Sequence, residues 1–446
     1  MILYFKRIFT ISKELEDKCN IYMNHLLVVY AFMIPISKRA ATAIFVVIIF
    51  LFLIRRNYIF YLRIGISNKI VQACLIFFSI YIIGFLWTDN YTYAKTILGD
   101  MKYIIYPIIF LSFLDKSFSY RVIASFIFGM LFSECLSYLI TFNIFPHSLS
   151  YKDIIIYATQ GSNNPTPFIN HGKYNIFMSI IIGIILYKLL KNRSSLYIRI
   201  ISIFFITTAT INITLIGGRI GYIGYFFIIL ATIIFVYRGK AFKYLFFGVS
   251  CLLLIGYIAF HSSSMFQNRV NDTVNDIEMI GDNNFNTSIG TRIGLWYYSS
   301  KVIGDNFFFG VGTGDHVDEV RKYIQEESKY NYLMQWKNLH SGYFEILVQF
   351  GIVGFILYLN IFYQIIRYKY ENEFKQFVIF IVSLGISIGI ITGVYGSALF
   401  LPLFAVVISS IVTKNKFITS KYIEPKKIYF YYMLLIIIFF IIAVLQ

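Results

Sequence analysis

The sequence predicts an all-α protein that crosses a membrane about twelve or thirteen times and carries one large, partly helical loop on the outer side. Hydrophobic residues make up 58% and aromatic residues 20% of the 446-residue chain, far more than in an average globular protein. Charged residues account for only 14%, and the apolar residues occur in blocks that approach the thickness of a bilayer. Lipid offers no hydrogen-bond partner to an open sheet edge, so we expect these blocks to be helices.

Thirteen apolar blocks are candidate membrane spans, and several are shorter than the roughly 20 residues that a perpendicular helix needs. In chain order they cover residues 21–36, 40–54, 70–87, 97–114, 121–145, 174–190, 200–217, 220–237, 244–260, 343–366, 376–395, 397–412 and 428–445. The first twenty residues are mixed and charged, so we expect no cleavable signal peptide.

The net charge of +17 is distributed in a way that indicates membrane orientation and argues against a nucleic-acid partner. Basic residues gather in short loops between the blocks, as the positive-inside rule describes for cytoplasmic loops. Four such clusters lie within residues 55–69, 188–199, 238–243 and 414–427. With the N-terminus inside, all four clusters fall on the cytoplasmic side, and residues 146–173 and 261–342 fall outside.

The outer segment 261–342 is too long for a simple connection and is expected to fold on the membrane surface. From His261 to Leu339 it has seven basic and ten acidic residues, a net charge of −3, in contrast to the positive remainder of the chain. Residues 293–303 form an amphipathic pattern and residues 317–329 a charged one, and both patterns predict helices.

The sequence holds no pattern typical of a metal site, a nucleotide site or a disulfide framework. The four cysteines are Cys19, Cys74, Cys135 and Cys251, which lie far apart. The histidines at 171, 261 and 316 have no metal-ligand spacing. The glycine-rich segment 310–315 lacks the Gly-Lys-Ser/Thr of a phosphate loop.

Arg219 is an arginine between two apolar blocks on the predicted outer side, where arginine is disfavoured in short loops. No acidic residue occurs between Asp153 and Asp272, so Arg219 needs a distant carboxylate, backbone carbonyls or an anionic ligand. Gly218 and Gly221 are expected to leave space beside it. The alternative is an arginine that extends to the membrane interface.

His340 stands at the outer end of the apolar block that begins near residue 343. Ser341 and Glu345 follow it. Glu345 either orients or charge-stabilises His340 or complements the positive N-terminus of the helix, and we expect the second role. Gly351 and Gly354 are three residues apart, so they are predicted to share a helix face and let another helix approach. The alternative for His340 is a polar residue at the membrane interface without a catalytic role.

Two arginines and one histidine on the outer side suggest a phosphate site beside a base. Arg219 and Arg292 lie in the same short motif, Gly-x-Arg-Ile-Gly, which occurs at residues 217–221 and 290–294. Guanidinium groups match phosphate oxygens in a bidentate fashion. An imidazole such as that of His340 titrates near ~6.5 and can accept a proton from a hydroxyl.

Three motifs follow one another between about residues 200 and 400. They are Gly-Gly-Arg219-Ile-Gly after a span, Thr-Arg292-Ile-Gly-Leu-Trp followed by Gly310-Val-Gly-Thr-Gly314, and His340-Ser341 followed after nine residues by Gly351-x-x-Gly354. With the nine spans before the large loop, this order resembles the superfamily of bacterial O-antigen ligases and O-antigen polymerases (the Wzy C-terminal domain). A span at 428–445 departs from the family pattern and would place the C-terminus outside.

The resemblance implies a glycosyltransferase of the GT-C type, with its active site at the periplasmic face of the bacterial inner membrane. The implied donor is a glycan on undecaprenyl diphosphate, and no metal, cofactor or nucleotide is implied. Arg219 and Arg292 would hold the diphosphate, and His340 would activate the acceptor hydroxyl for an inverting transfer. Ser341, Glu345, Gly218, Gly221, Gly351 and Gly354 would support this site.

The acceptor distinguishes the two arms of this superfamily. A ligase transfers the glycan to lipid A-core in lipopolysaccharide biosynthesis, whereas a polymerase transfers it to the next lipid-linked repeat of an O-antigen, capsule or exopolysaccharide. The His-Ser spacing favours the ligase. A transporter or flippase for the same lipid-linked glycan is a further alternative, but it would not need a histidine at a span end, and no internal repeat is visible.

We therefore expect three regions along the chain. N-terminal transmembrane helices occupy residues 1–199. A ligase- or polymerase-like core occupies residues 200–413 and includes the loop 261–342. Residues 414–446 form a basic cytoplasmic segment and the possible last span.

Overall fold

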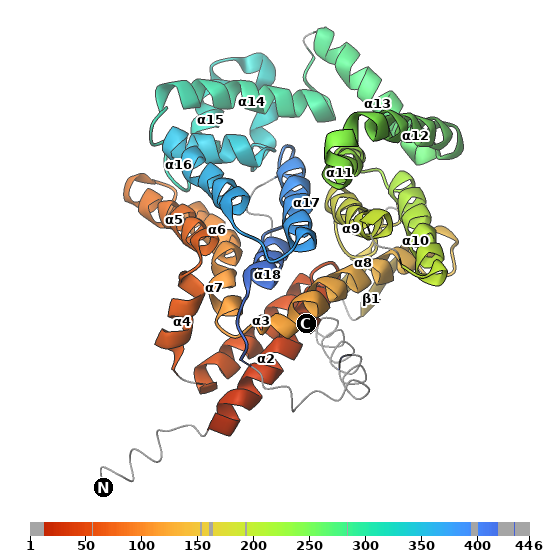
Figure 1. The fold of residues 1–446 in the computed structure, drawn as a ribbon. Coiled ribbons are helices and arrows are strands. Elements are labelled where there is room, and N and C mark those ends of the chain that lie inside the picture. The colour runs from red at the N-terminus through yellow and green to blue at the C-terminus, as the bar shows by residue number, and fades with distance from the viewer. Residues whose placement is uncertain are drawn as a thin grey trace.

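The computed structural model describes residues 13–55, 57–151, 154–159, 164–191, 194–282, 284–393, 400–417 and residue 432, and these are almost entirely helical (Figure 1). The first half contains α2 (Lys13–Met33), α3 (Lys38–Arg55), α4 (Tyr58–Ile66), α5 (Lys69–Ile83), α6 (Tyr91–Met101), α7 (Tyr106–Leu111), α8 (Ser119–Thr141) and α9 (His171–Lys191). The second half contains α10 (Leu196–Leu215), α11 (Arg219–Tyr237), α12 (Ala241–Ser262), α13 (Ser264–Gly281), α14 (Ser288–Asp305), α15 (His316–Gln325), α16 (Gly342–Arg367), α17 (Glu373–Gly389) and α18 (Phe400–Val412).

Short elements connect or extend these helices. The 3-10 helices are η1 (Gly84–Trp87), η2 (Lys102–Ile105), η3 (Lys116–Phe118), η4 (Arg238–Lys240) and η5 (Ser328–Gln335). Strands β1 (Ser148–Tyr151) and β2 (Ile154–Ala158) form one antiparallel hairpin in the connection between α8 and α9. The prediction of an all-α membrane protein is confirmed, with this hairpin as a small addition.

Six stretches of the described residues are long and apolar enough to cross a membrane. They are Lys69–Trp87, Lys116–Thr141, His171–Lys191, Leu196–Leu215, Arg219–Ser262 and Gly342–Arg367. The fifth has 44 residues and consists of α11 and α12 with η4 between them. The predicted count of twelve or thirteen spans is higher, because helices such as α17 and α18, with 17 and 13 residues, are too short to qualify. Apart from residue 432, the predicted span at 428–445 lies outside the described residues.

The centre of the bundle is α9, which packs against α10, α11 and α17. Its residues from Tyr174 to Ile184 are buried: most are apolar, and the Asn175 and Ser179 side chains donate hydrogen bonds to backbone carbonyls inside the bundle. By contrast, α10 and α12 expose many Ile, Leu and Phe side chains, as expected of helices that face lipid.

The outer segment 261–342 folds into its own small domain at the end of the bundle away from α2 (Figure 1). The helices predicted at 293–303 and 317–329 are α14 and α15, although α15 ends earlier, at Gln325. The amphipathic helix α13 was not predicted. A separate hydrophobic cluster, which includes Leu295, Val320 and Leu333, holds α14, α15 and η5 together.

Helix α16 is broken at Gly351, and this differs from the prediction of a continuous helix with a glycine face. Gly351 has φ 59° and ψ −157°, a conformation that only glycine adopts readily. The N–H groups of Ile352 and Val353 donate to the carbonyls of Phe307 and Phe308, over 2.8 and 3.3 Å. The element that approaches Gly351 is therefore a loop from the outer domain. Gly354 is packed against Phe350 of the same helix.

The same loop satisfies the carbonyls that the break leaves free. The N–H groups of Val311 and Gly312 donate to the carbonyls of Val348 and Gln349, each over 2.9 Å. Gly310 and Gly312 both have positive φ, of 64° and 98°, which explains the glycines at these positions. The break in α16 thus becomes a docking site for the outer domain, with its backbone groups paired.

The glycine-rich loop also anchors to the first half of the chain. Thr313 Oγ1 donates to the Tyr81 carbonyl over 2.9 Å. The Asp315 carboxylate accepts from the N–H groups of Asp89 and Asn90, over 2.8 and 2.7 Å, just before α6. These contacts fix the outer domain, and with it the start of α16, to the ends of α5 and α6.

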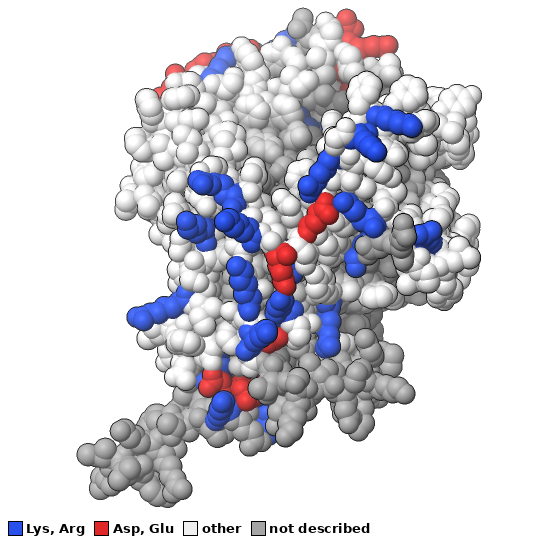
Figure 2. Space-filling view, in the orientation of Figure 1, with Lys and Arg blue, Asp and Glu red and all other residues white. Residues whose placement is uncertain are grey.

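The surface charge changes along the molecule. Figure 2 shows most of the Lys and Arg side chains in view over the middle and lower part of the face, with a few Asp and Glu among them, and further Asp and Glu at its upper edge. The outer domain lies at that upper end in the same orientation (Figure 1). This arrangement follows the distribution expected from the positive-inside rule.

Candidate functional site

Arg219 is the first residue of α11 and reaches into the outer domain. Its Nη1 donates to Oδ2 of Asp276 over 2.8 Å and to Oγ1 of Thr273 over 3.3 Å. The Arg219 side chain is 23% exposed. Of the three kinds of partner expected from the sequence, a distant carboxylate is the one present.

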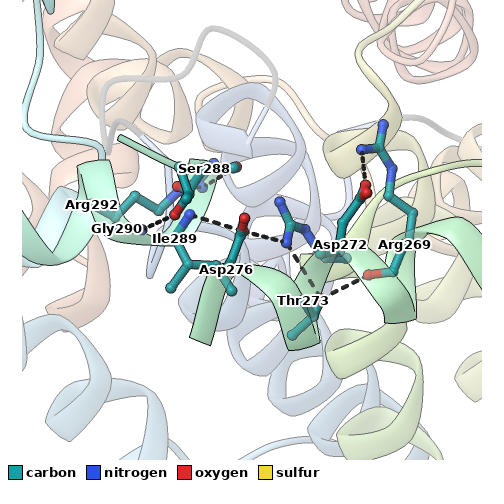
Figure 3. A network of polar contacts seen from close by, with 10 residues as sticks. Arg269, Asp272, Thr273, Asp276, Ser288, Ile289, Gly290 and Arg292 are labelled. Atoms are coloured by element: carbon teal, nitrogen blue, oxygen red, sulfur yellow. Dashed lines mark hydrogen bonds and ion pairs between the residues drawn. The ribbon is translucent and has the colours of Figure 1, made fainter. Parts of the chain in front are cut away.

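Asp276 connects three helices at this point. Its carboxylate accepts from Arg219 of α11 and from the N–H of Ile289, over 3.2 Å, at the start of α14. Asp276 itself belongs to α13, and only 8% of its surface is exposed. A carboxylate at a helix N-terminus is favoured by the helix dipole, so Asp276 stabilises α14 through Ile289 (Figure 3). The same carboxylate holds Arg219.

Arg292 lies one turn into α14, and its Nη1 donates to the carbonyl and, over 2.8 Å, to the hydroxyl of Ser288. Burial and the nearby Arg219 lower the pKa of Arg292, and the charge of Asp276 opposes that effect. The guanidinium nevertheless stays charged. Its Nε is buried and has no hydrogen-bond partner among the described residues. The structure therefore brings the two predicted arginines into one charged cluster.

Arg269 is a third arginine of this cluster, and the sequence prediction missed it. It lies on α13 and forms an ion pair with Asp272 over 3.1 Å (Figure 3). Its Nε is buried without a partner in the described part of the chain. A Cβ atom on Gly217 would come within 2.8 Å of this Nε.

A sequence signal for Arg269 does exist. Arg269, Thr273 and Asp276 are spaced by four and three residues, so they share one face of a helix. Ser263 is a favourable N-cap for that helix, and its hydroxyl accepts from the N–H of Phe266. Recognition of α13 would have placed Arg269 beside the partners of Arg219.

His340 occupies the turn immediately before α16. Its φ is 52°, a left-handed conformation that is uncommon for a residue other than glycine. The Asn338 side chain accepts from the His340 N–H over 3.1 Å, and the Trp336 ring packs edge-on at 4.7 Å between centroids. These contacts fix the backbone and the ring of His340.

The electrostatic environment of His340 favours the neutral imidazole. Burial and the Arg292 guanidinium lower its pKa below the ordinary value. Its Nε2 is buried and makes no hydrogen bond to any described residue. At neutral pH this nitrogen can therefore accept a proton, and the electrostatic influence of Arg292 connects His340 to the arginine cluster.

Ser341 and Glu345, which follow His340, were expected to support the site. Ser341 is the N-cap residue of α16 but makes no side-chain cap hydrogen bond. Glu345 lies in the first turn of α16, as expected for a group that complements the helix dipole, and is only 5% exposed. Burial and, next in size, the charge of Glu345 raise the pKa of Tyr93 to about 12. The Glu345 carboxylate therefore also influences the electrostatics of α6, which carries Tyr93.

Gly218 and Gly221 do not leave open space beside Arg219, contrary to expectation. A Cβ atom on Gly218 would lie 2.9 Å from the His171 carbonyl oxygen, and one on Gly221 would overlap the Asn175 side chain. Both glycines are therefore needed for the close packing of α11 against α9. This packing fixes the N-terminus of α11, and so the direction of Arg219.

Among the residues that the structure describes, no three His, Cys, Asp or Glu side chains converge as metal ligands. The outer cluster consists of three arginines, two carboxylates and His340. Guanidinium groups that already hold a carboxylate can bind another anion through their remaining N–H groups. The arrangement is chemically suited to an anionic leaving group beside a proton acceptor.

Comparison with known proteins identifies the region that holds this cluster. Residues 201–359 match a family model described as O-antigen ligase. The matched region runs from α10 into α16 and includes Arg219, Arg292 and His340. A protein of Haemophilus influenzae, described as uncharacterized, is 31% identical over 171 residues. The alignment covers 37% of this chain and 42% of that protein, so the chain spans less than half of this relative.

Proposed function

We propose that the protein transfers a glycan from undecaprenyl diphosphate to an acceptor hydroxyl, and the match of residues 201–359 to a family model described as O-antigen ligase supports this proposal. The transfer takes place at the periplasmic face of the bacterial inner membrane. The acceptor is lipid A-core, so the reaction attaches O-antigen in lipopolysaccharide biosynthesis. The transfer domain corresponds to residues 200–413, with residues 1–199 as supporting membrane helices and 414–446 as a basic cytoplasmic end.

The observation that carries this proposal is a set of buried nitrogen atoms with no partner in the described residues. Nε of Arg269, Nε of Arg292 and Nε2 of His340 all belong to this set. A buried polar group without a partner costs about 1–3 kcal/mol, and a bound ligand that accepts or donates a hydrogen bond there would recover that cost. A diphosphate and a hydroxyl offer the matching groups.

In the proposed reaction the acceptor hydroxyl oxygen forms a bond to the anomeric carbon while the bond from that carbon to the diphosphate breaks. The bonding electrons leave with the diphosphate, and the hydroxyl proton passes to Nε2 of His340. Arg219 and Arg292 stabilise the growing negative charge through preorganised N–H groups. A single displacement of this kind inverts the anomeric configuration.

Asp276 has a positioning role in this proposal. Its hydrogen bonds to Arg219 and to the start of α14 hold the two arginine-bearing helices at a fixed separation. Ser341, Glu345, Gly351 and Gly354 position the start of α16, and Gly218 and Gly221 that of α11. Because arginines supply the positive charge, transfer by the purified enzyme is expected to continue in excess EDTA.

Deletion of the gene, followed by chemical analysis of lipopolysaccharide and of carrier-linked glycan, tests the proposal. A ligase predicts loss of all attached O-chain while polymer remains on the lipid carrier. A core that bears a single repeat would instead identify a repeat-unit polymerase. Loss of attached O-chain with the lipid-linked glycan retained on the cytoplasmic side would contradict both and favour a transporter.

A further inference from the structure

A cavity of about 780 Å³ lies at the opposite end of the bundle from the arginine and His340 cluster. It is bounded by the start of α5, the end of α16 and the end of α18. The other end of α5 contacts the glycine-rich loop, and the other end of α16 follows His340. The cavity is therefore separated from the candidate active site by the length of these helices.

Among the described residues, four cations line this cavity and no carboxylate does. They are Lys69, Arg367, Lys369 and Lys414, and all four are exposed. None of them forms an ion pair with a carboxylate of the described residues. The Arg367 guanidinium donates to the Tyr363 hydroxyl of its own helix over 2.7 Å, which holds it toward the cavity.

In a neighbouring hollow on this face, by contrast, the lining cations do have an acidic partner. Lys191 and Arg238 line that hollow, and both pair with Glu373, over 3.2 and 3.0 Å. The described lining of the 780 Å³ cavity contains no corresponding acid. Within this part of the chain, its positive charge is therefore available to an external anion.

The walls of the cavity identify the class of that anion. Ile76 and Tyr363 line it and are 48% and 50% exposed, on α5 and α16, both of which belong to stretches able to cross a membrane. The cavity thus opens past apolar side chains that face lipid. A soluble phosphate compound has no apolar group to pack against these side chains, whereas a phospholipid has both a phosphate and an acyl chain.

We propose that this cavity binds the phosphate headgroup of an anionic phospholipid, with an acyl chain along α5 and α16 past Ile76 and Tyr363. Basic pockets between membrane helices bind such headgroups, because each cation near the surface adds to the attraction. Bound in this way, the lipid joins the ends of α5, α16 and α18. The site is independent of the transfer reaction, so it can be tested without a glycan donor.

Native mass spectrometry of the full-length protein, stripped of lipid in mild detergent, provides the test. We expect phosphatidylglycerol to bind more tightly than phosphatidylcholine by about tenfold or more. The variant Lys69→Gln/Arg367→Gln/Lys414→Gln should lose this preference. The control Arg199→Gln/Lys240→Gln/Lys243→Gln removes the same charge from exposed cations that do not line the cavity, and it should keep the preference.

The proposal would be overturned if both triple variants lost the preference equally. It would also be overturned if both kept it. Two soluble probes, inorganic phosphate and glycerophosphoglycerol, distinguish the sources of the phosphate. Neither should bind at the concentration at which the lipid saturates the site. Tight binding of either probe, abolished by the cavity variant, would assign the site to a soluble phosphate compound and overturn the lipid assignment.

Discussion

His340 combines a strained backbone, a fixed ring and a nitrogen atom without a partner in the described chain. A left-handed conformation costs a residue of this kind roughly 1–2 kcal/mol. The contacts with Trp336 and Asn338 offset part of that cost, yet they leave Nε2 unused. Strain maintained beside an unused nitrogen is better explained by a functional role for the ring than by an interfacial position alone.

The first prediction concerns the proton transfer assigned to His340. His340→Ala should lower single-turnover transfer by ~100- to 10,000-fold, the usual contribution of a general base, while donor binding stays nearly unchanged. His261→Ala, an exposed histidine at the end of α12, is the matched control and should transfer normally.

The pH dependence follows from the sign of the His340 shift. The neutral ring is the active form, so transfer is present above its pKa and is lost as pH falls through it. Since burial and Arg292 lower that pKa, the loss should occur below about pH 6.5. A wild-type rate that stays constant from about pH 4 to 8 would rule out the base role.

The second prediction concerns Arg292 and its partners. Arg292→Lys keeps the charge but loses the planar donor geometry, so transfer should fall without disappearing. Arg292→Ala should lose roughly 100- to 1,000-fold, as expected when a donor to the leaving group is removed. The same order of effects is expected at Arg219. Lys337→Ala removes an exposed cation of the outer domain and serves as the control in the same transfer assay. Wild-type rates in Arg219→Ala and Arg292→Ala would eliminate the diphosphate site.

At the scale of the elements, the break in α16 determines where the site lies. The two halves of α16 exchange four backbone hydrogen bonds with residues 307–312 in place of the bonds that a continuous helix would make. The outer domain is thereby attached to the helix that begins next to His340. The positions of Arg292 and His340 relative to each other depend on this attachment.

The third prediction tests that attachment. Gly351→Ala introduces a Cβ within 2.5 Å of the Phe307 and Phe308 backbone, at a φ/ψ that costs a side-chain-bearing residue about 1–3 kcal/mol. Its thermal unfolding temperature in detergent should fall, together with transfer. Gly256→Ala is the control, because nothing lies within 4 Å of a Cβ there, and helix propensity makes it neutral or slightly stabilising. Equal stability of the two variants would contradict the proposed role of the break.

The sequence predicted some of these elements and missed others for physical reasons. Apolar blocks predicted helices because lipid allows little else, and Arg219, Arg292 and His340 stood out as polar residues in apolar surroundings. The break at Gly351 could not be predicted, because it depends on a loop some forty residues earlier that supplies the missing hydrogen bonds. The partnership of Arg219 with Asp276, 57 residues later, is likewise a tertiary contact.

At the scale of the whole molecule, the two ends of the bundle carry different chemistry. One end holds the arginines, His340 and the outer domain, and the other holds cations around a cavity that form no ion pair with a described residue. This difference in chemistry matters for the proposed function only if the two ends face different compartments. The proposed reaction uses a lipid-linked glycan on the outer side, whereas the positive-inside rule places loops rich in Lys and Arg on the inner side.

The fourth prediction tests this orientation with single cysteines in a variant that lacks the four native ones. Asp282→Cys and Lys329→Cys in the outer domain should react with a membrane-impermeant thiol reagent applied from the periplasmic side. Lys188→Cys in α9 and Lys240→Cys in η4 lie at the end of the bundle opposite to the outer domain. They should react only after the membrane is permeabilised. All four side chains are exposed, so a difference in labelling reports compartment and not burial. The reverse pattern would place His340 and the arginines in the cytoplasm, where the proposed periplasmic transfer could not occur.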